Sequence, residues 1–450
     1  MLFRSNGIDI YMKSTNKKRA KRVFKNPKLK ANKSYKFKLY RTKRNKYLHN
    51  LIDISGIVYN HCIALKRRYY KMYGALIEEQ NSKLEDKKQP KNKSINTRRL
   101  QEHITKLKSL PKYEYWNNIP SQAFQDITAR IAGSYSRHFS VRKKGVKSSL
   151  PFFKKVKKYK SFTLRQAGWS IEKSNVIRIC DKTFKFSKSR EIEGVIKTVT
   201  IKRDTLGDLY IFFAVHQSKP ESIFKSGKSV GMDFGLKTFL TVNEDWGKKE
   251  AYSIESPLFF KQNRKMVVLK NKKVSSKRVM EEVTIKGKKR KRMKNVQSQN
   301  YYKALLDLTR TYKFVANKRR DWMFKLAKTL CEQNDYIFIE DLCMKGMQRL
   351  WGRKVSDLGF SEFVKILESQ GLKYFCVVHK IGRFKPSTKE CYDCGFINNN
   401  LTLRDRAWAC TDCGVEHNRD ISSAAYIHRE GISSLGLDGV KPCVSQVSVV

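Results

Sequence analysis

Four cysteines in the C-terminal part of the chain have the spacing of a metal site. Cys391 and Cys394 form one Cys-x-x-Cys-Gly knuckle, and Cys410 and Cys413 form a second knuckle after fifteen intervening residues. Each knuckle turns two sulfurs toward one point, so four thiolates at this spacing can close the tetrahedral shell that Zn²⁺ prefers. Because four cysteines leave no open coordination position, the spacing predicts a structural zinc ribbon and not a catalytic zinc centre.

Three carboxylates lie at positions where an acid is unfavourable unless it binds a partner. Asp233 lies in an apolar strand pattern, Glu340 ends a second such pattern, and Asp420 precedes a helical pattern shortly after the second knuckle. A buried acid costs free energy unless it binds something, and clustered carboxylates repel one another unless cations intervene. Strand acid, strand-end acid and helix-start acid is the arrangement of an RNase H-like nuclease with two Mg²⁺ ions. We therefore predict Asp233 as the bridging magnesium ligand and Glu340 and Asp420 as flanking ligands.

Each acid also has an ordinary structural explanation when it is taken alone. Asp233 is followed two residues later by Gly235, a combination that is common in turns, and acids such as Asp420 often cap helices. Three unrelated acids in turns and caps would need no metal. This alternative is weakened because the order of the acids, their contexts and the positive charge of the chain agree.

The charge of the chain predicts a polyanionic partner. Lysine and arginine total 96 against 40 aspartates and glutamates, which gives a formal net charge of +56 over 450 residues. The excess runs along the whole chain, so nucleic acid is a better match than a membrane surface. A soluble basic protein without such a partner is the alternative.

The remaining cysteines favour a reducing compartment. Six of the ten cysteines lie outside the two knuckles, scattered without a pairing pattern. The basic N-terminus lacks the apolar run of a signal peptide, and no stretch approaches the length of a transmembrane helix. These features predict a cytoplasmic protein with no membrane partner.

The strand and helix patterns around the candidate residues predict a fold that combines all-β and α/β parts. An alternating strand near residue 37 and further strands from 162 to 216 predict a small barrel, with two helical blocks inserted in it. After residue 226, the two acid-bearing strands flank a long helical pair, with apolar stripes at 305–315 and 323–330. The predicted boundaries are 1–31 for a basic disordered arm, 32–43 for the first barrel strand, 44–140 for the helical insertion, 141–225 for the rest of the barrel, 226–385 for the nuclease domain with the helical pair, 386–416 for the zinc ribbon, 417–430 for the last acid and its helix, and 431–450 for the tail.

Two basic stretches have open interpretations. Residues 142–160 interleave cations with Phe152, Phe153 and Tyr159, a mixture that can bind bases and phosphates but also occurs in ordinary solvated loops. The dense basic run within 261–294 is either a solvated, mobile loop or a segment that follows phosphates. In the ribbon, Lys389 or Arg404 could contact nucleic acid.

Taken together, these motifs resemble TnpB, the OrfB-type nuclease of insertion sequences, and more distantly the compact type V CRISPR effectors. The resemblance covers about residues 33 to 428 and is specific because several motifs occur in combination. The motifs that carry it are Ile119-Pro120-Ser121-Gln122-Ala123, Gly231-Met232-Asp233-Phe234-Gly235, Ile339-Glu340-Asp341-Leu342 with Met344-Lys345-Gly346-Met347, Lys385-Pro386-Ser387-Thr388-Lys389 and His417-Asn418-Arg419-Asp420.

The resemblance implies an RNA-guided DNA endonuclease encoded by a transposon. A guide RNA would pair with one strand of double-stranded target DNA, and one RuvC site would cut both strands, with structural Zn²⁺ and two catalytic Mg²⁺ ions as cofactors. The implied fold is a wedge β-barrel with an inserted helical recognition lobe, followed by a RuvC nuclease domain with an inserted zinc ribbon. The expected setting is a prokaryotic cytoplasm with access to the nucleoid, with a monomer bound to RNA as the favoured state. The charge agrees, since a guide–target duplex is recognised mainly through its backbone.

Three positions depart from the family pattern. Ser422 and Tyr426 stand where asparagine is common, and Phe324 stands where histidine is common. Because Ser422 can still form a hydrogen bond, we expect activity to be kept. Two other functions stay open: a nuclease-inactive RNA-guided DNA-binding protein, against which the presence of all three acids argues, and a DNA transposase that transfers strands.

Overall fold

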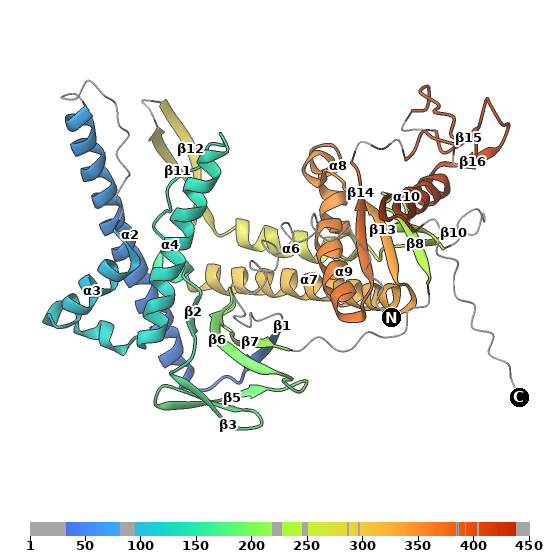
Figure 1. The fold of residues 1–450 in the computed structure, drawn as a ribbon. Helices are drawn as coiled ribbons and strands as arrows, with labels where there is room; N and C mark the ends of the chain where they lie inside the picture. Colours follow the sequence, from blue (N-terminus) through green and yellow to red (C-terminus); the bar gives the residue numbers. More distant parts are fainter. Residues whose placement is uncertain are drawn as a thin grey trace, which may run out of the picture. The chain divides into compact units, whose positions relative to one another are not determined.

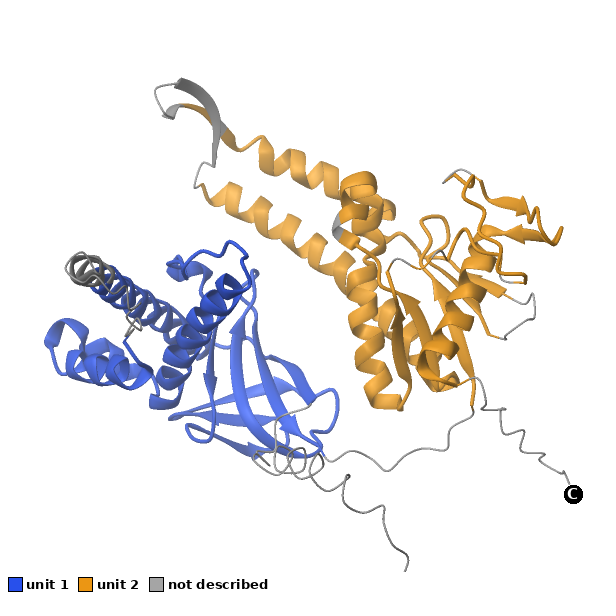
Figure 2. Ribbon diagram, turned by 45° about the horizontal axis from the view of Figure 1, so that its top comes forward, with its two compact units in different colours: residues 1–219 blue, residues 220–450 orange. Residues whose placement is uncertain are grey.

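The computed structural model divides into two compact units, residues 1–219 and 220–450 (Figure 2). This division lies close to the boundary predicted at 225/226. The predicted basic arm, the tail beyond residue 437 and Arg404 lie outside the described residues. The structure describes residues 33–81, 95–217, 227–244, 251–285, 288–295, 298–383, 385, 387–391, 393–402 and 405–437.

The first unit is built on a seven-stranded antiparallel sheet with the order β2-β6-β7-β1-β5-β4-β3 (Figure 1). The alternating pattern near residue 37 forms β1, whose aromatic Phe37 packs on Phe186 and Phe213 with ring centroids 5.4 and 6.0 Å away. The described pairing ends at β2 and β3, so it does not by itself close the predicted barrel. The strands are β1 (Lys33–Leu39), β2 (Ser161–Leu164), β3 (Trp169–Lys173), β4 (Val176–Ile179), β5 (Lys182–Ser187), β6 (Val195–Arg203) and β7 (Leu209–His216).

The helical blocks of the first unit lie between β1 and β2 in the chain, as the patterns predict. The apolar stripe expected on the first helix is buried at Leu51, Ile54, Val58 and Cys62, within the same core as the sheet. The helices therefore stabilise the strands that flank them in the sequence. They are α2 (Asn45–Asn81), α3 (Thr97–Lys108), the 3₁₀ helix η1 (Pro111–Asn118) and α4 (Ser121–Lys143), with a 3₁₀ turn η2 (Val156–Lys158) before β2.

The second unit contains a five-stranded mixed sheet with the order β10-β9-β8-β13-β14. Strand β8 pairs antiparallel with β9 and parallel with β13, and β13 pairs parallel with β14. The inner strands β8 and β13 are covered on both faces, which is why they are continuous apolar runs in the sequence. The strands are β8 (Ser229–Asp233), β9 (Leu240–Asn243), β10 (Ala251–Ile254), β13 (Tyr336–Glu340) and β14 (Val377–Ile381).

Helices cover the two faces of this sheet (Figure 1). On one face, α7 (Gln299–Gln333) and α9 (Phe360–Tyr374) form a core with the strand residues Met232 and Ile339. On the other face, α10 (Arg419–Leu435) packs Tyr426 and Ile427 against Phe338. The side chains of β13 therefore alternate between two cores. The smaller elements are α5 (Phe259–Gln262), α6 (Arg264–Ser275), α8 (Met344–Leu358) and the ribbon strands β15 (Ala407–Ala409) and β16 (Glu416–Asn418).

The predicted helical pair is one continuous helix, so the prediction of a break between the two stripes is wrong. Helix α7 has 35 residues, and its buried positions include Val315 and Met323, two turns apart. Between them, Arg319 takes the inward position and donates hydrogen bonds to the Ser356 carbonyl and the Glu362 carboxylate, both at 2.9 Å. A paired arginine thus continues the inward-facing stripe between the two apolar halves of the helix.

The basic run within 261–294 has regular structure, which differs from the solvated loop that was one of its two interpretations. It contains α6 and a hairpin formed by β11 (Arg278–Ile285) and β12 (Lys288–Asn295). Its predicted contact with phosphates stays a prediction. Within the described residues, no helix is long and apolar enough to cross a membrane.

Candidate active site and metal centre

The structure brings the three predicted acids to one edge of the second unit's sheet. Asp233 is the last residue of β8 and Glu340 is the last residue of β13. These strands are parallel neighbours with Met232 paired to Ile339. The next residues, Asp233 and Glu340, therefore lie side by side at the carboxyl ends of the two strands. Asp420 joins them from the first turn of α10, which crosses β8.

Helix α10 approaches β8 closely because glycine lies at the crossing. A Cβ atom at Gly231 would lie 2.3 Å from the Ala424 carbonyl oxygen and 2.5 Å from the His428 nitrogen. The Ser229 hydroxyl also forms a 2.7 Å hydrogen bond with His428 Nε2. The glycine of the Gly-Met-Asp motif therefore allows the helix to bring Asp420 toward the strand acids.

Electrostatics link the three carboxylates. Burial raises the pKa of Asp233 to about 6, and the nearby Asp420 adds to this rise. Burial also raises the pKa of Glu340 to about 7, with further contributions from Asp233 and Asp341. The charged forms of Asp233 and Glu340 are thus disfavoured by burial and by neighbouring carboxylates, as expected for acids that hold cations.

Asp420 has a cationic partner that the sequence analysis missed. One nitrogen of Arg406, Nη1, lies 3.0 and 3.3 Å from the two carboxylate oxygens of Asp420. The backbone holds this arrangement, because the Arg419 N–H donates to the Arg406 carbonyl at 2.9 Å and the Asn418 side chain caps α10. The signal in the sequence is weak, since Arg406 is one of several cations in the ribbon.

The four predicted cysteines converge on one point. The sulfurs of Cys391 and Cys413 are 3.6 Å apart, as are those of Cys394 and Cys410, and all four lie within 4.8 Å of one another. A tetrahedron with Zn–S bonds of about 2.3 Å has edges of about 3.8 Å, so the geometry fits one Zn²⁺ ion. After each knuckle a glycine with φ of +80° or +72° turns the chain back.

A further residue, His417, lies at this cysteine cluster and was predicted only as part of a motif. Its Nε2 lies 3.1 Å from the sulfur of Cys391, and its Nδ1 lies 3.2 Å from the hydroxyl of Ser422. Ser422, the departure closest to the last acid, therefore faces the ribbon. Of the other departures, Tyr426 is buried beside Phe338, and Phe324 is 39% exposed.

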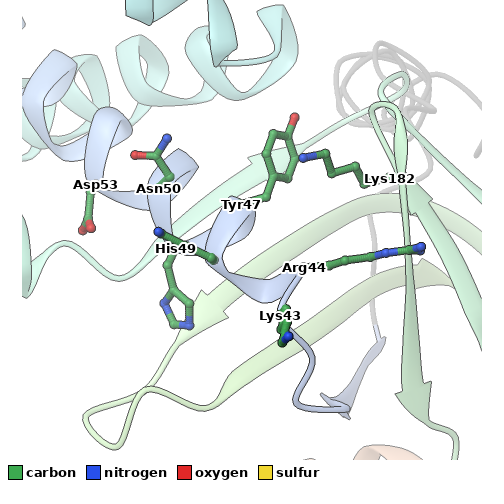
Figure 3. Close-up of a pocket in the computed structure, with 8 residues that line it drawn as sticks. Lys43, Arg44, Tyr47, His49, Asn50, Asp53 and Lys182 are labelled. Carbon is green, nitrogen blue, oxygen red and sulfur yellow. The ribbon is translucent and has the colours of Figure 1, made fainter.

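The first unit carries a basic pocket of about 560 Å³ at the start of α2 (Figure 3). The ammonium of Lys182 lies 4.3 Å from the ring centroid of Tyr47, so a cation and an aromatic ring meet at the pocket wall. This combination suits a phosphate next to a base or sugar. The lining residues are Lys43, Arg44, Lys46, Tyr47, His49, Asn50, Asp53 and Lys182.

A second aromatic and cationic group lies in the predicted basic loop. Phe152 and Phe153 are 64% and 53% exposed, and the guanidinium of Arg67 lies 5.6 and 5.0 Å from their ring centroids. Arg67 is held by a 2.8 Å hydrogen bond to the Pro151 carbonyl. Tyr159, the third aromatic of this prediction, is buried in the core instead.

Two family models match the chain. The model OrfB_IS605, described as a probable transposase, matches residues 212–350, and the Cas12f1-like TNB domain matches residues 360–427. A putative RNA-guided DNA endonuclease of Streptomyces pristinaespiralis is 24% identical over 346 residues, which are 75% of this chain and 79% of that protein. The TnpB-like protein L79 of Acanthamoeba polyphaga mimivirus is 26% identical over 59% of this chain and 51% of its own length.

Two solved structures are also similar. The Cas12f1–sgRNA–target DNA complex has a TM-score of 0.33 and 14% identity, with coverage of 88% of this chain and 98% of that chain. CasPhi-2 (Cas12j) bound to crRNA has a TM-score of 0.37 and 11% identity, with coverage of 88% and 97%.

The regions matched by the two family models contain all three acids and all four knuckle cysteines. Residues 212–350 thus match the model of the OrfB proteins of insertion sequences. Together with the TnpB-like relatives and the relatives named as RNA-guided DNA endonucleases, these matches support a TnpB-type protein, as the motifs predict.

Proposed function

We propose that this TnpB-type protein is a transposon-encoded, RNA-guided DNA endonuclease whose active site consists of Asp233, Glu340 and Asp420. The observation that carries the proposal is the convergence of the three acids, from β8, β13 and α10, at one sheet edge. The raised pKa values of Asp233 and Glu340 support it, because both groups respond to neighbouring carboxylates. The relatives named as RNA-guided DNA endonucleases support the substrate class.

The architecture supports an RNase H-like RuvC domain. An antiparallel pair, β9 and β8, continues into the parallel strands β13 and β14, with helices on both faces. The ribbon is inserted between β14 and α10, immediately before the last acid. In the first unit, a sheet with helices inserted after its first strand supports the wedge and recognition lobe.

In the proposed mechanism, the protein positions charge around the scissile phosphate. Asp233 would hold the magnesium ions together with Glu340 and Asp420. When bound, the two ions supply an activated water and stabilise the leaving oxygen. Because Asp233 and Glu340 are partly desolvated, a bound cation would interact with their carboxylates more strongly than it would in water. Arg406 orients the Asp420 carboxylate by its contact at 3.0 Å.

The nucleic-acid partners follow from charge and surface chemistry. The basic pocket at the start of α2 and the Arg67 group with its two exposed phenylalanines offer cations beside aromatic rings. We propose that guide RNA and double-stranded target DNA bind this chain with a net charge of +56, with one protein molecule per RNA. The four cysteines would hold Zn²⁺, which would brace the segment that leads to Asp420.

The test is a cleavage assay with the protein purified together with the RNA encoded beside its gene. With Mg²⁺, the wild type should cut a matched target plasmid, while Asp233→Ala should bind the same target and cut at least about 10³-fold more slowly. A wild type that binds but never cuts would favour the nuclease-inactive binder. Joined products from transposon ends would favour a strand-transfer enzyme.

A further inference from the structure

His417 lies between the zinc cysteines and the helix that carries Asp420. Its Nε2 contacts the Cys391 sulfur at 3.1 Å, and its Nδ1 contacts the Ser422 hydroxyl at 3.2 Å. His417 and Ser422 are only 2% and 3% exposed. Both ring nitrogens are therefore used in contacts that water does not readily replace.

The ribbon fixes the orientation of this ring. His417 is the middle residue of β16 and pairs with Trp408 in β15, and the two rings pack with centroids 4.5 Å apart. The next residue, Asn418, caps α10. The imidazole thus stands at the junction of ribbon and helix, and a rotation about its χ angles would break both nitrogen contacts.

The chemistry of a zinc-bound cysteine gives these contacts a direction. A metal-bound thiolate can only accept a hydrogen bond, so the proton of the neutral imidazole lies on Nε2. Nδ1 then accepts a hydrogen bond from the Ser422 hydroxyl. In zinc sites, such outer contacts set the tautomer and orientation of the groups around the metal.

We propose that His417 is a positioning residue that transmits the state of the zinc site, through Cys391 and Ser422, to Asp420 in the first turn of α10. The proposal rests on the proposed function for the role of Asp420 in cleavage. Cys391, Asp393 and His417 also lie within 4.8 Å, which would allow His417 to be a ligand itself. The four-sulfur set is favoured because its distances match a tetrahedral thiolate shell.

The first test distinguishes the roles of the two ring nitrogens by measuring how fast zinc is released. An asparagine amide reaches the place of Nδ1, and a glutamine amide reaches that of Nε2. With a chelator, His417→Asn should release zinc at least about 10-fold faster than the wild type, because the Cys391 sulfur loses the hydrogen bond from the imidazole. His417→Gln should stay within about twofold. Equal release by both variants would overturn the assignment. A zinc site with only three bound thiolates and His417 as the fourth ligand would also contradict it.

The second test follows hydrogen exchange of the amides in residues 420–426 without nucleic acid. Removing zinc from the wild type should speed this exchange about fivefold, the effect of losing one hydrogen bond. Ser422→Ala with zinc bound should show the same increase, and removing its zinc should add little. Ser433→Ala, at an exposed site near the end of the same helix, is the matched control and should match the wild type. Wild-type exchange in Ser422→Ala, or fully additive effects, would overturn the proposal.

A third measurement is the Mg²⁺ dependence of DNA cleavage. Ser422→Ala should raise the Mg²⁺ concentration for half-maximal cleavage while guide and target binding stay unchanged. If Asp420→Ala still cuts, the proposed active site fails, whereas the exchange and zinc results still test the His417 contact. An unchanged Mg²⁺ requirement in Ser422→Ala would show that the contact does not reach Asp420.

Discussion

At the scale of single residues, the candidate site is a set of acids that the fold keeps close despite their repulsion. Burial and neighbouring carboxylates raise the pKa of Asp233 to about 6 and that of Glu340 to about 7. Such a cluster lowers the free energy of unfolding of the protein. Cations that bind to the folded state raise it again.

The raised pKa values predict how stability depends on pH. Between about pH 4 and pH 7 the folded state binds more protons than the unfolded chain, so stability without magnesium should fall as the pH rises through this window. Glu340→Gln removes one such group and should raise the melting temperature at pH 8 by about 2–4 °C, which is about 1 kcal/mol for a unit of this size. Thermal scans of the zinc-loaded protein at several pH values measure this.

A control variant distinguishes this effect from a general loss of surface charge. Glu332, which is exposed and pairs with Lys328 on α7, should give almost no change when it is replaced by glutamine. Equal responses of Glu332→Gln and Glu340→Gln would contradict the electrostatic account of the site.

At the scale of elements, α10 decides whether the site forms, because it supplies one acid and lies directly on the sheet. A Cβ at Gly431 would lie 2.1 to 2.8 Å from the Phe338 ring and its Cβ atom, which are buried in the centre of β13. Gly431→Ala should therefore destabilise the second unit by about 1–3 kcal/mol and lower cleavage by moving Asp420. Urea unfolding measures the loss.

Gly133 offers the matched control for this prediction. It lies inside helix α4, and a Cβ built there meets nothing within 4 Å. Gly133→Ala should stabilise the protein by up to about 1 kcal/mol through helix propensity. If Gly431→Ala also stabilised the protein, the close packing of α10 on β13 would be refuted.

The ribbon is the second element that can be tested alone. Cys391→Ser should reduce the zinc content well below one ion per chain and lower the melting temperature, because three cysteines no longer close the shell. Elemental analysis and a thermal scan measure the two effects. Cys62→Ser, at a buried cysteine in the core of the first unit, should keep its zinc. Full zinc content in Cys391→Ser would rule out the four-cysteine site.

At the scale of the whole molecule, charge should govern the affinity for nucleic acid. Binding that neutralises 6–10 phosphates loses about 10³- to 10⁵-fold in affinity between 50 and 200 mM salt, and we expect this range for the guide RNA. Arg44→Ala, in the basic pocket, should weaken binding and reduce the salt slope by about 1.

The control for the pocket is a cation of similar exposure that is already paired. Lys325 lies on α7, 2.9 Å from Asp321, and its replacement by alanine should leave the salt slope unchanged. If Arg44→Ala and Lys325→Ala behaved alike, binding would depend on total charge and not on this pocket.

Much of the local structure could be predicted because it repeats within a few residues. The alternation around Phe37 and the stripe from Leu51 to Cys62 became a strand and a helix, since side-chain direction follows the backbone period. Helix α7 was divided wrongly because Arg319 is polar, although its partner Glu362 makes an inward position acceptable. Such a partner cannot be recognised from local periodicity.

The sequence by itself determined which groups can react and which can bind metal. Three acids at strand and helix ends and two cysteine knuckles are legible because their chemistry depends on residue type and short spacing. Only the tertiary structure decided which contacts join these sites. Arg406 meets Asp420, and His417 joins Cys391 to Ser422, because pairing of β15 with β16 brings distant segments together. Contacts of this kind arise from packing between segments, which local spacing does not encode.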